Sequence, residues 1–154
     1  MTEPVVHATI TIERTFAASP ARVFAAFSTP ATKRRWFAEG FGMEVQEFSL
    51  DFRVGGRESS RMVPKDGRGF ANDTVYQDIV PDQRIICAFT MSREGRRFSA
   101  SLATFELAPD GDGTKLTFTE QAAFLGESDG PEQRKGGWTQ LFEKLAQELK
   151  ELKG

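Results

Sequence analysis

The sequence predicts an α+β fold in which a curved antiparallel sheet wraps around one long C-terminal helix. Runs rich in β-branched and aromatic residues, separated by short turn signals, follow one another through the middle of the chain. A Gly55-Gly56 pair inside one of these runs marks a place where a strand bends sharply or where another backbone approaches closely. The C-terminal segment carries an apolar stripe at helical spacing.

The composition is that of one globular domain spanning residues 1–154. The chain is 39% hydrophobic and 27% charged, and its length allows a core of normal size. A net charge of −2 predicts neither a nucleic-acid partner nor an anionic membrane surface. The 14 phenylalanines, against two tryptophans and one tyrosine, favour a wide apolar interior, although the same rings would also fill a closed core.

The chain is predicted to begin with a strand and two short helices. Residues 5–17 are rich in β-branched residues, which is typical of a strand. Ser19-Pro20 supplies an N-cap residue and a first-turn proline, and apolar residues then recur at helical spacing. Thr29-Pro30 ends this helix and begins a second one, which we expect to reach about Phe37.

Six further strands are predicted, over residues 43–50, 52–63, 69–80, 84–92, 97–108 and 114–124. Turn signals separate most of them, at Lys65-Asp66-Gly67, Pro81-Asp82, Glu94-Gly95 and residues 109–113. Strands joined by short turns pair with their neighbours along the chain. We therefore expect an antiparallel meander of six to seven strands.

The last predicted element is a helix from Pro131 to about Leu152. Its apolar stripe consists of Trp138, Leu141, Phe142, Leu145, Leu149 and Leu152. A sheet of six or seven strands has more concave surface than one helix can fill. The sequence therefore predicts a cavity between the sheet and this helix, with Gly137-Trp138 near its mouth.

Several motifs follow one another along the chain: the helical segment 21–27, Trp36, the segments 51–57, 80–85 and 113–117, and Gly136-Gly137-Trp138. In this order they resemble those of the START-like (SRPBCC) superfamily, and within it the family of homologues of the heat-shock-protein-90 ATPase activator. The resemblance covers nearly the whole chain. It implies the helix-grip fold, with a deep apolar cavity between sheet and helix, and it implies no shared catalytic residue.

The resemblance does not favour a chaperone partner. The co-chaperone that gives the family its name carries an additional domain ahead of this module. In this sequence nothing precedes the module, so we do not expect a chaperone-stimulating role. Function also does not follow from fold alone, because one fold supports many activities.

The residue types that bind metals are sparse. Cys87 is the only cysteine and His7 the only histidine, and they are far apart in the sequence. We therefore expect neither a metal site nor a cofactor, and we place His7 on a solvent-facing strand. The N-terminus resembles no signal peptide and the chain has no apolar run of membrane-spanning length. With a single cysteine, these features predict a cytoplasmic protein with no membrane partner.

Glu120 is the weak candidate for a catalytic residue. It alternates with Leu116, Phe118 and Ala122, so it should face the interior. A carboxylate in an apolar cavity has a raised pKa unless a cation pairs with it, and it would then act as an acid or bind a polar ligand. The alternatives are that Glu120 lies where the strand nears the rim, or that it pairs with a buried arginine such as Arg61 or Arg97.

Strand alternation and helical spacing also predict the residues of the cavity wall. On the 69–80 strand, Gln77 shares its predicted inward face with Val75. An inward amide needs a partner, which would be Glu120, water or ligand. The apolar wall is predicted to consist of Trp36, Phe89, Met91, Phe105, Phe118, Trp138, Leu141 and Phe142, unless these side chains pack against one another.

Three functions fit the sequence. The first is binding of a small apolar ligand, such as a lipid, polyketide or aromatic compound. The second is an enzyme of cyclase or hydrolase type, for which Glu120 and Gln77 are the only inward polar pair. The third is a protein-interaction module, a homodimer or a chaperone-associated protein, with the loop 37–41 or an exposed edge strand as the contact surface.

Overall fold

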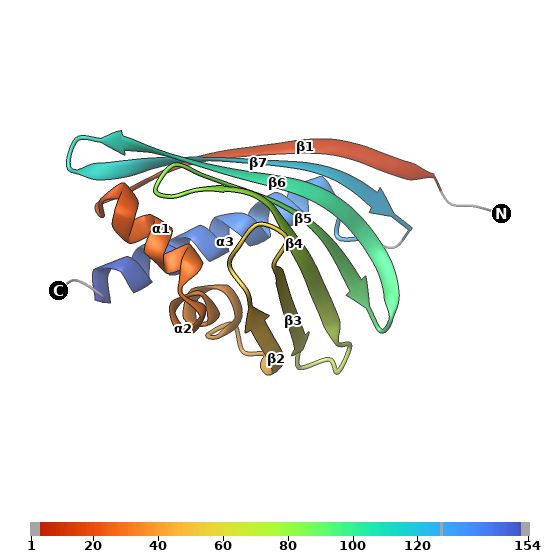
Figure 1. Ribbon diagram of the computed structural model, residues 1–154. Coiled ribbons are helices and arrows are strands. Elements are labelled where there is room, and N and C mark those ends of the chain that lie inside the picture. The colour runs from red at the N-terminus through yellow and green to blue at the C-terminus, as the bar shows by residue number, and fades with distance from the viewer. Residues whose placement is uncertain (1–3, 127, 152–154) are drawn as a thin grey trace.

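The fold is a seven-stranded antiparallel sheet that curves around one long helix (Figure 1). The computed structural model describes residues 4–126 and 128–151. The strands are β1 (Val5–Phe16), β2 (Glu44–Leu50), β3 (Arg57–Val63), β4 (Phe70–Val80), β5 (Arg84–Arg93), β6 (Arg96–Asp110) and β7 (Gly113–Leu125). The helices are α1 (Pro20–Ser28), α2 (Pro30–Lys33), the π-helix η1 (Arg34–Ala38) and α3 (Gly130–Glu151).

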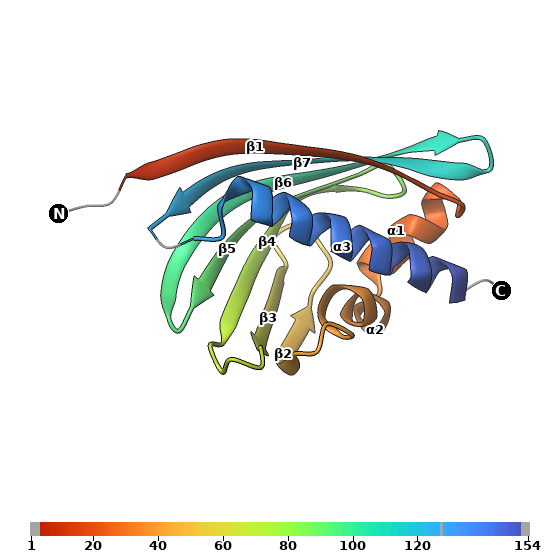
Figure 2. The same ribbon diagram turned by 180° about the vertical axis from the view of Figure 1, so that it is seen from behind.

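The sheet confirms the predicted meander. Its strand order is β1-β7-β6-β5-β4-β3-β2, so each strand from β2 to β7 pairs with its neighbour in the sequence and β1 closes the sheet beside β7. Figure 2 shows α3 crossing the concave face of the sheet, with α1 and α2 near its C-terminal end. The predicted α+β class and the order of its elements are therefore confirmed.

The turn between β2 and β3 corrects one predicted boundary. The strand expected over 52–63 begins only at Arg57, because residues 51–56 form a tight turn. Gly55 has a φ of +81°, and its N–H donates to the carbonyl oxygen of Tyr76 over 2.8 Å. The sharp bend predicted for the Gly55-Gly56 pair is confirmed, and it carries the chain from the edge strand β2 into β3, beside β4.

The closed core is aromatic and lies under the middle of α3. Phe118 packs between Phe105 and Trp138, with ring centroids 5.1 and 4.6 Å away. Phe27 contacts both Trp36 and Phe105 at 5.1 Å. Aromatic pairs at these separations add to the stability that burial of their apolar area already provides.

The C-terminal half of α3 is fastened to the first helices. Phe142, Leu145 and Leu149 are buried on its inner face, as the apolar stripe predicts, whereas Leu152 lies outside the described residues. Arg22 of α1 donates to the carbonyl oxygen of Leu149 over 2.8 Å. Arg35 of η1 also pairs with Glu148. No helix in the described part of the chain is both long and apolar enough to cross a membrane.

The bend before β3 leads to a prediction about Gly56. A Cβ atom at this position would lie 2.1 Å from the carbonyl oxygen of Asp51, a distance that backbone atoms cannot tolerate. Gly56→Ala should therefore lower the free energy of unfolding by about 1–3 kcal/mol, the range for over-packing. Urea denaturation measures this change. Gly69→Ala is the control, because a Cβ there meets its nearest atom at an ordinary 3.5 Å, and equal losses in the two variants would contradict the prediction.

Candidate functional site

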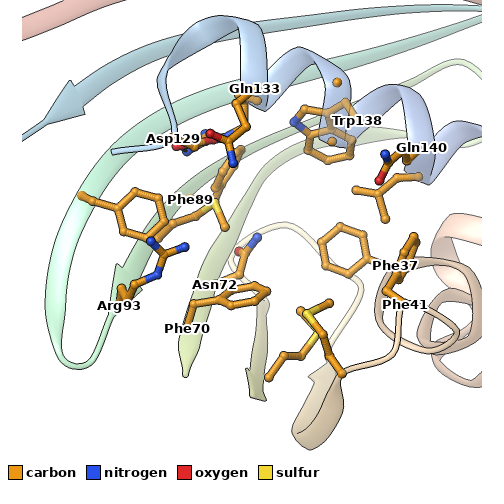
Figure 3. A pocket seen from close by; sticks show the side chains of 18 residues that line it. Phe37, Phe41, Phe70, Asn72, Phe89, Arg93, Asp129, Gln133, Trp138 and Gln140 are labelled. Atoms are coloured by element: carbon orange, nitrogen blue, oxygen red, sulfur yellow. Dashed lines mark hydrogen bonds and ion pairs between the residues drawn. The ribbon is translucent and has the colours of Figure 1, made fainter. Parts of the chain in front are cut away.

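A pocket of about 580 Å³ lies between the N-terminal half of α3 and strands β3 to β6 (Figure 3). Figure 3 shows Trp138 and Gln140 reaching into it from α3, and Phe70, Asn72, Phe89 and Arg93 from the sheet. The complete lining consists of Phe37, Phe41, Met43, Met62, Phe70, Asn72, Phe89, Met91, Arg93, Phe98, Asp129, Gln133, Arg134, Gly136, Gly137, Trp138, Gln140 and Leu141.

The apolar part of the lining is built from adaptable side chains. Five of its residues are phenylalanines and three are methionines, Met43, Met62 and Met91. These are all the methionines of the described residues, since the only other one is Met1. Methionine is unbranched and polarizable, and it is over-represented at surfaces that accept varied partners. The pocket therefore differs in chemistry from the closed aromatic core beside it.

Two glycines of α3 leave the pocket open. Gly136 and Gly137 line the pocket, and a Cβ atom added to either would meet nothing within 4 Å. Glycine inside a helix lowers stability by about 0.5–1 kcal/mol relative to alanine. Close packing therefore does not require glycine at these two exposed positions, where a side chain would begin in open space beside the pocket.

A buried polar network fastens α3 to the sheet at the inner end of the pocket. Glu120 on β7 is fully buried. It accepts hydrogen bonds from the guanidinium of Arg134 at 2.6 Å, the indole N–H of Trp138 at 2.8 Å and the hydroxyl of Ser101 at 2.7 Å. Arg134 and Trp138 are four residues apart on α3, so they share one helix face. Three donors and one countercharge together satisfy the carboxylate.

Arg134 is bonded on every side. Its guanidinium also donates to both carboxylate oxygens of Asp129, at 2.7 and 2.9 Å, and to the hydroxyl of Ser99 at 2.8 Å. Burial alone would lower the pKa of Arg134, but the hydrogen bonds and charges of Asp129 and Glu120 outweigh burial and raise it. Arg134 thus links Asp129 and Glu120 in one network of ion pairs.

A second buried cluster supports Phe37 in the pocket wall. The Lys33 ammonium donates to Glu58 at 2.7 Å and lies 4.7 Å from the centroid of the Phe37 ring. The Tyr76 hydroxyl donates to the same Glu58 oxygen at 2.5 Å. Burial, followed by the Glu58 charge, raises the pKa of Tyr76, so the hydroxyl keeps the proton that it donates. None of Lys33, Glu58 and Tyr76 lines the pocket.

The predicted wall residues divide between the pocket and the closed core. Phe89, Met91, Trp138 and Leu141 line the pocket. Trp36, Phe105, Phe118 and Phe142 are at most 4% exposed and pack together in the core instead. The region under the middle of α3 that we expected to be hollow is therefore filled with rings, and the pocket lies beside it.

The inward orientation predicted for Gln77 is wrong. Gln77 is exposed, and its amide donates to the carbonyl oxygen of Val75 at 3.3 Å. The pairing of β4 with β5 shifts between Tyr76 and Asp78, so Gln77 is the extra residue of a β-bulge. Thr74 and Tyr76 are the buried residues there, and Val75 between them faces the outer side of the sheet.

Glu120 faces inward as predicted, but its partner differs from the expected ones. Arg61 is exposed and pairs with Glu47, and Arg97 is also exposed. The partner is Arg134. The helical pattern did not reveal this, because nothing in the sequence distinguishes a buried arginine near the start of a helix from an exposed one. Glu120 and Gln77 are not brought together, and neither lines the pocket. The enzyme alternative therefore loses its polar pair.

Sequence reasoning also missed most of the pocket's other residues. Met43, Met62, Phe70 and Phe98 come from strand ends, where alternation is short and gives little indication of facing. The small number of methionines was a usable signal, since all three in the described region gather at one site. Within the described residues, no group of three His, Cys, Asp or Glu side chains could hold a metal ion.

Comparison with known proteins supports the fold and places the chain among its relatives. The family model described as Activator of Hsp90 ATPase homolog 1-like protein matches residues 17–150. None of the curated proteins matches the chain.

Solved structures match over nearly the full length. An uncharacterized protein from Rhizobium leguminosarum is 41% identical, with a TM-score of 0.92, covering 96% of this chain and 97% of that one. A protein from Rhizobium loti is 50% identical, with a TM-score of 0.88, covering 95% and 99%. A protein from Aeromonas hydrophila, described as like the same activator, is 21% identical with a TM-score of 0.70, covering 94% and 93%, and this likeness shows the fold alone.

The network predicts a large cost for Glu120→Gln. The change removes a buried charge that faces Arg134, although Asp129 still neutralises the guanidinium. The free energy of unfolding should fall by about 3 kcal/mol, the lower end for breaking a buried ion pair. Glu47→Gln is the matched control, since it breaks the exposed pair with Arg61 and should cost less than about 1 kcal/mol. Similar urea midpoints for the two variants would overturn this interpretation of the network.

Burial also predicts that Cys87 is unreactive. The pKa of the Cys87 thiol is raised to about 12, and burial is the largest cause of this shift. The thiol therefore stays protonated near neutral pH and lacks the reactive thiolate. The folded protein should therefore not react with an aromatic disulfide reagent at about pH 8, and one thiol per chain should react after unfolding in urea. Thr139→Cys, on an exposed position of α3, should react at once. Rapid labelling of the folded wild-type chain would contradict the prediction.

Proposed function

The chain belongs to the family of Activator of Hsp90 ATPase homolog 1-like proteins, and from this premise we propose that it binds a small, mainly apolar molecule in the pocket beside α3. The volume of about 580 Å³ lies within the range of about 300–1,000 Å³ that is usual for small-molecule sites. Phenylalanine and methionine dominate the walls. Such a lining favours lipids, polyketides or aromatic compounds.

The two glycines of α3 are the observation that carries this proposal. A long helix that only had to cover the sheet would gain stability from alanine at both positions. Instead, Gly136 and Gly137 line the pocket, and a Cβ at either position would meet only open space. Their presence favours a role for the open space itself, because stability alone does not account for them.

The other two functions have less support from the described residues. The enzyme alternative required Glu120 and Gln77, and the former is enclosed by three donors while the latter is exposed. The interaction alternative relied on the loop 37–41. Phe37 and Phe41 of that loop line the pocket, so their rings contribute to the ligand site. Formation of a homodimer stays a prediction.

Gly137→Leu tests the proposal. The leucine side chain should occupy the pocket and lower the affinity for N-phenyl-1-naphthylamine, a neutral apolar fluorophore, by at least about tenfold, the effect of losing 1.4 kcal/mol of binding free energy. Fluorescence titration measures the affinity. The same variant should unfold at higher urea concentration, because leucine favours the helix by up to about 1 kcal/mol over glycine.

Gln147→Leu is the matched control for Gly137→Leu. It adds a leucine to an exposed position of the same helix that does not line the pocket, and it should leave the affinity unchanged. Failure of the wild-type chain to bind the fluorophore would overturn the proposed function. Unchanged binding by Gly137→Leu would show that the molecule does not use this pocket.

A further inference from the structure

We propose that the ligand carries a single anionic head group, a carboxylate, which Arg93 and Asn72 bind at the sheet side of the pocket. This inference rests on the proposed ligand-binding function and specifies the chemical class of the ligand. It follows from an inventory of which polar groups in the pocket are already bonded and which are not.

Among the charged residues that line the pocket in the described part of the chain, Arg93 is the one whose charge is available to a ligand. It is the last residue of β5 and follows Phe89 and Met91 on the inward face of that strand, and all three line the pocket. Its guanidinium lies 5.5 Å from the centroid of the Phe98 ring, which orients it. Arg93 forms no ion pair with the residues 4–126 and 128–151, and it is half-buried.

Asn72 adds a second donor on the same face of the sheet. Its side-chain oxygen accepts a hydrogen bond from the Thr74 hydroxyl at 2.9 Å, which leaves the amide N–H groups for another acceptor. Phe70 pairs directly with Arg93, and Asn72 is the next inward residue of β4. Diagonal neighbours of this kind lie roughly 7–8 Å apart, within reach of one head group between them. Figure 3 shows both side chains pointing from the sheet into the pocket.

Ser60 extends this polar region. It pairs with Asn72 across strands β3 and β4, and it is 1% exposed. Its hydroxyl has no hydrogen-bond partner among the described residues. An unpaired buried hydroxyl is costly, but Ser60 does not line the pocket, so it adds a polar position behind Asn72 and not a ligand contact.

The remaining charged groups of the pocket are engaged with one another. Both oxygens of Asp129 accept from Arg134, and Arg134 donates to Glu120 as well. On the sheet side of the pocket, the polar atoms left are therefore the donors of Arg93 and Asn72, whereas the Gln133 and Gln140 amides lie on the helix side. A ligand that satisfies them must bring acceptors. Among residues 4–126 and 128–151, no unpaired carboxylate lines the pocket that could offset a positively charged ligand beside Arg93.

The charge balance favours one negative charge rather than two. Glu120, Asp129 and Arg134 together carry a net charge of −1, and this excess negative charge next to the pocket disfavours a dianion more than a monoanion. A phosphate dianion would have one guanidinium as its partner and the Asp129 carboxylate on the same pocket wall. A carboxylate matches the planar fork of a single arginine, with two parallel N–H to oxygen bonds. Its apolar part would extend toward Phe37, Phe41 and Trp138, away from Arg93 (Figure 3).

Competition against bound N-phenyl-1-naphthylamine tests this inference. The competitors are decanoate, decanol and decyl phosphate, which share one alkyl chain and differ in the head group. Decanoate should displace the fluorophore at a concentration at least about tenfold lower than decanol, the effect of one charge-assisted hydrogen-bonded pair. Decyl phosphate should compete less well than decanoate.

Arg93→Met and Arg93→Gln should remove the preference for decanoate over decanol, because both retain an unbranched side chain without the charge. Urea denaturation shows whether each variant is folded. If Arg93→Met is not folded, Arg93→Gln provides the test. Arg96→Met is the matched control, since it removes an exposed arginine from the same hairpin and should keep the preference.

The outcomes separate the two proposals. If the wild-type chain does not bind the fluorophore, the ligand-binding function itself fails. If the fluorophore binds but decanoate and decanol compete equally, or if both Arg93 variants keep the preference, the anionic head group is wrong while the pocket stands. Stronger competition by decyl phosphate than by decanoate would overturn the choice of a carboxylate.

Discussion

The buried carboxylate of Glu120 is the constraint on which the rest of the structure depends. A charge at the centre of an aromatic core is tolerated only when a countercharge and further donors surround it. Arg134 and Trp138 provide these from two successive turns of α3, and Ser101 provides another from β6. Because both helix residues must reach the same carboxylate, the N-terminal half of α3 lies over β6 and β7. The concave side of β3, β4 and β5 is then left uncovered, and this is where the pocket forms.

Two interiors of different character result, side by side under one helix. The closed core consists of rings such as Phe105, Phe118 and Phe142, which contact one another closely and leave no room for a ligand. Methionines and phenylalanines line the pocket, and α3 contributes two glycines to the same lining. The first interior provides stability through packing density. The second has the adaptable, methionine-rich lining on which the proposed ligand binding rests.

The charge that the pocket has available to a ligand lies on one side of it. Arg134 and Asp129 neutralise each other and hold the helix, so their charges are not available to a ligand. Arg93 and Asn72 stand apart from that network on the strands opposite. An otherwise apolar pocket thus has donors at one side and rings at the other, which is the arrangement that orients an amphipathic molecule. The wider fold supports many activities, so specificity resides in such details of the lining.

The sequence by itself determined the order of elements, the meander and the bend at Gly55-Gly56. It also determined the inward faces of Phe89, Met91 and Glu120. Alternation, helical spacing and turn residues are sufficient for this because they all report local structure. It did not determine where Gln77 points, since one extra residue in β4 reverses the alternation and strand periodicity carries no sign of a bulge. Nor did it determine the partner of Glu120 or which rings line the pocket. Both depend on how α3 lies across the sheet. That placement results from contacts between residues 14 to 35 positions apart, such as Arg134 with Glu120 and Ser99. Only the tertiary structure brings such residues together.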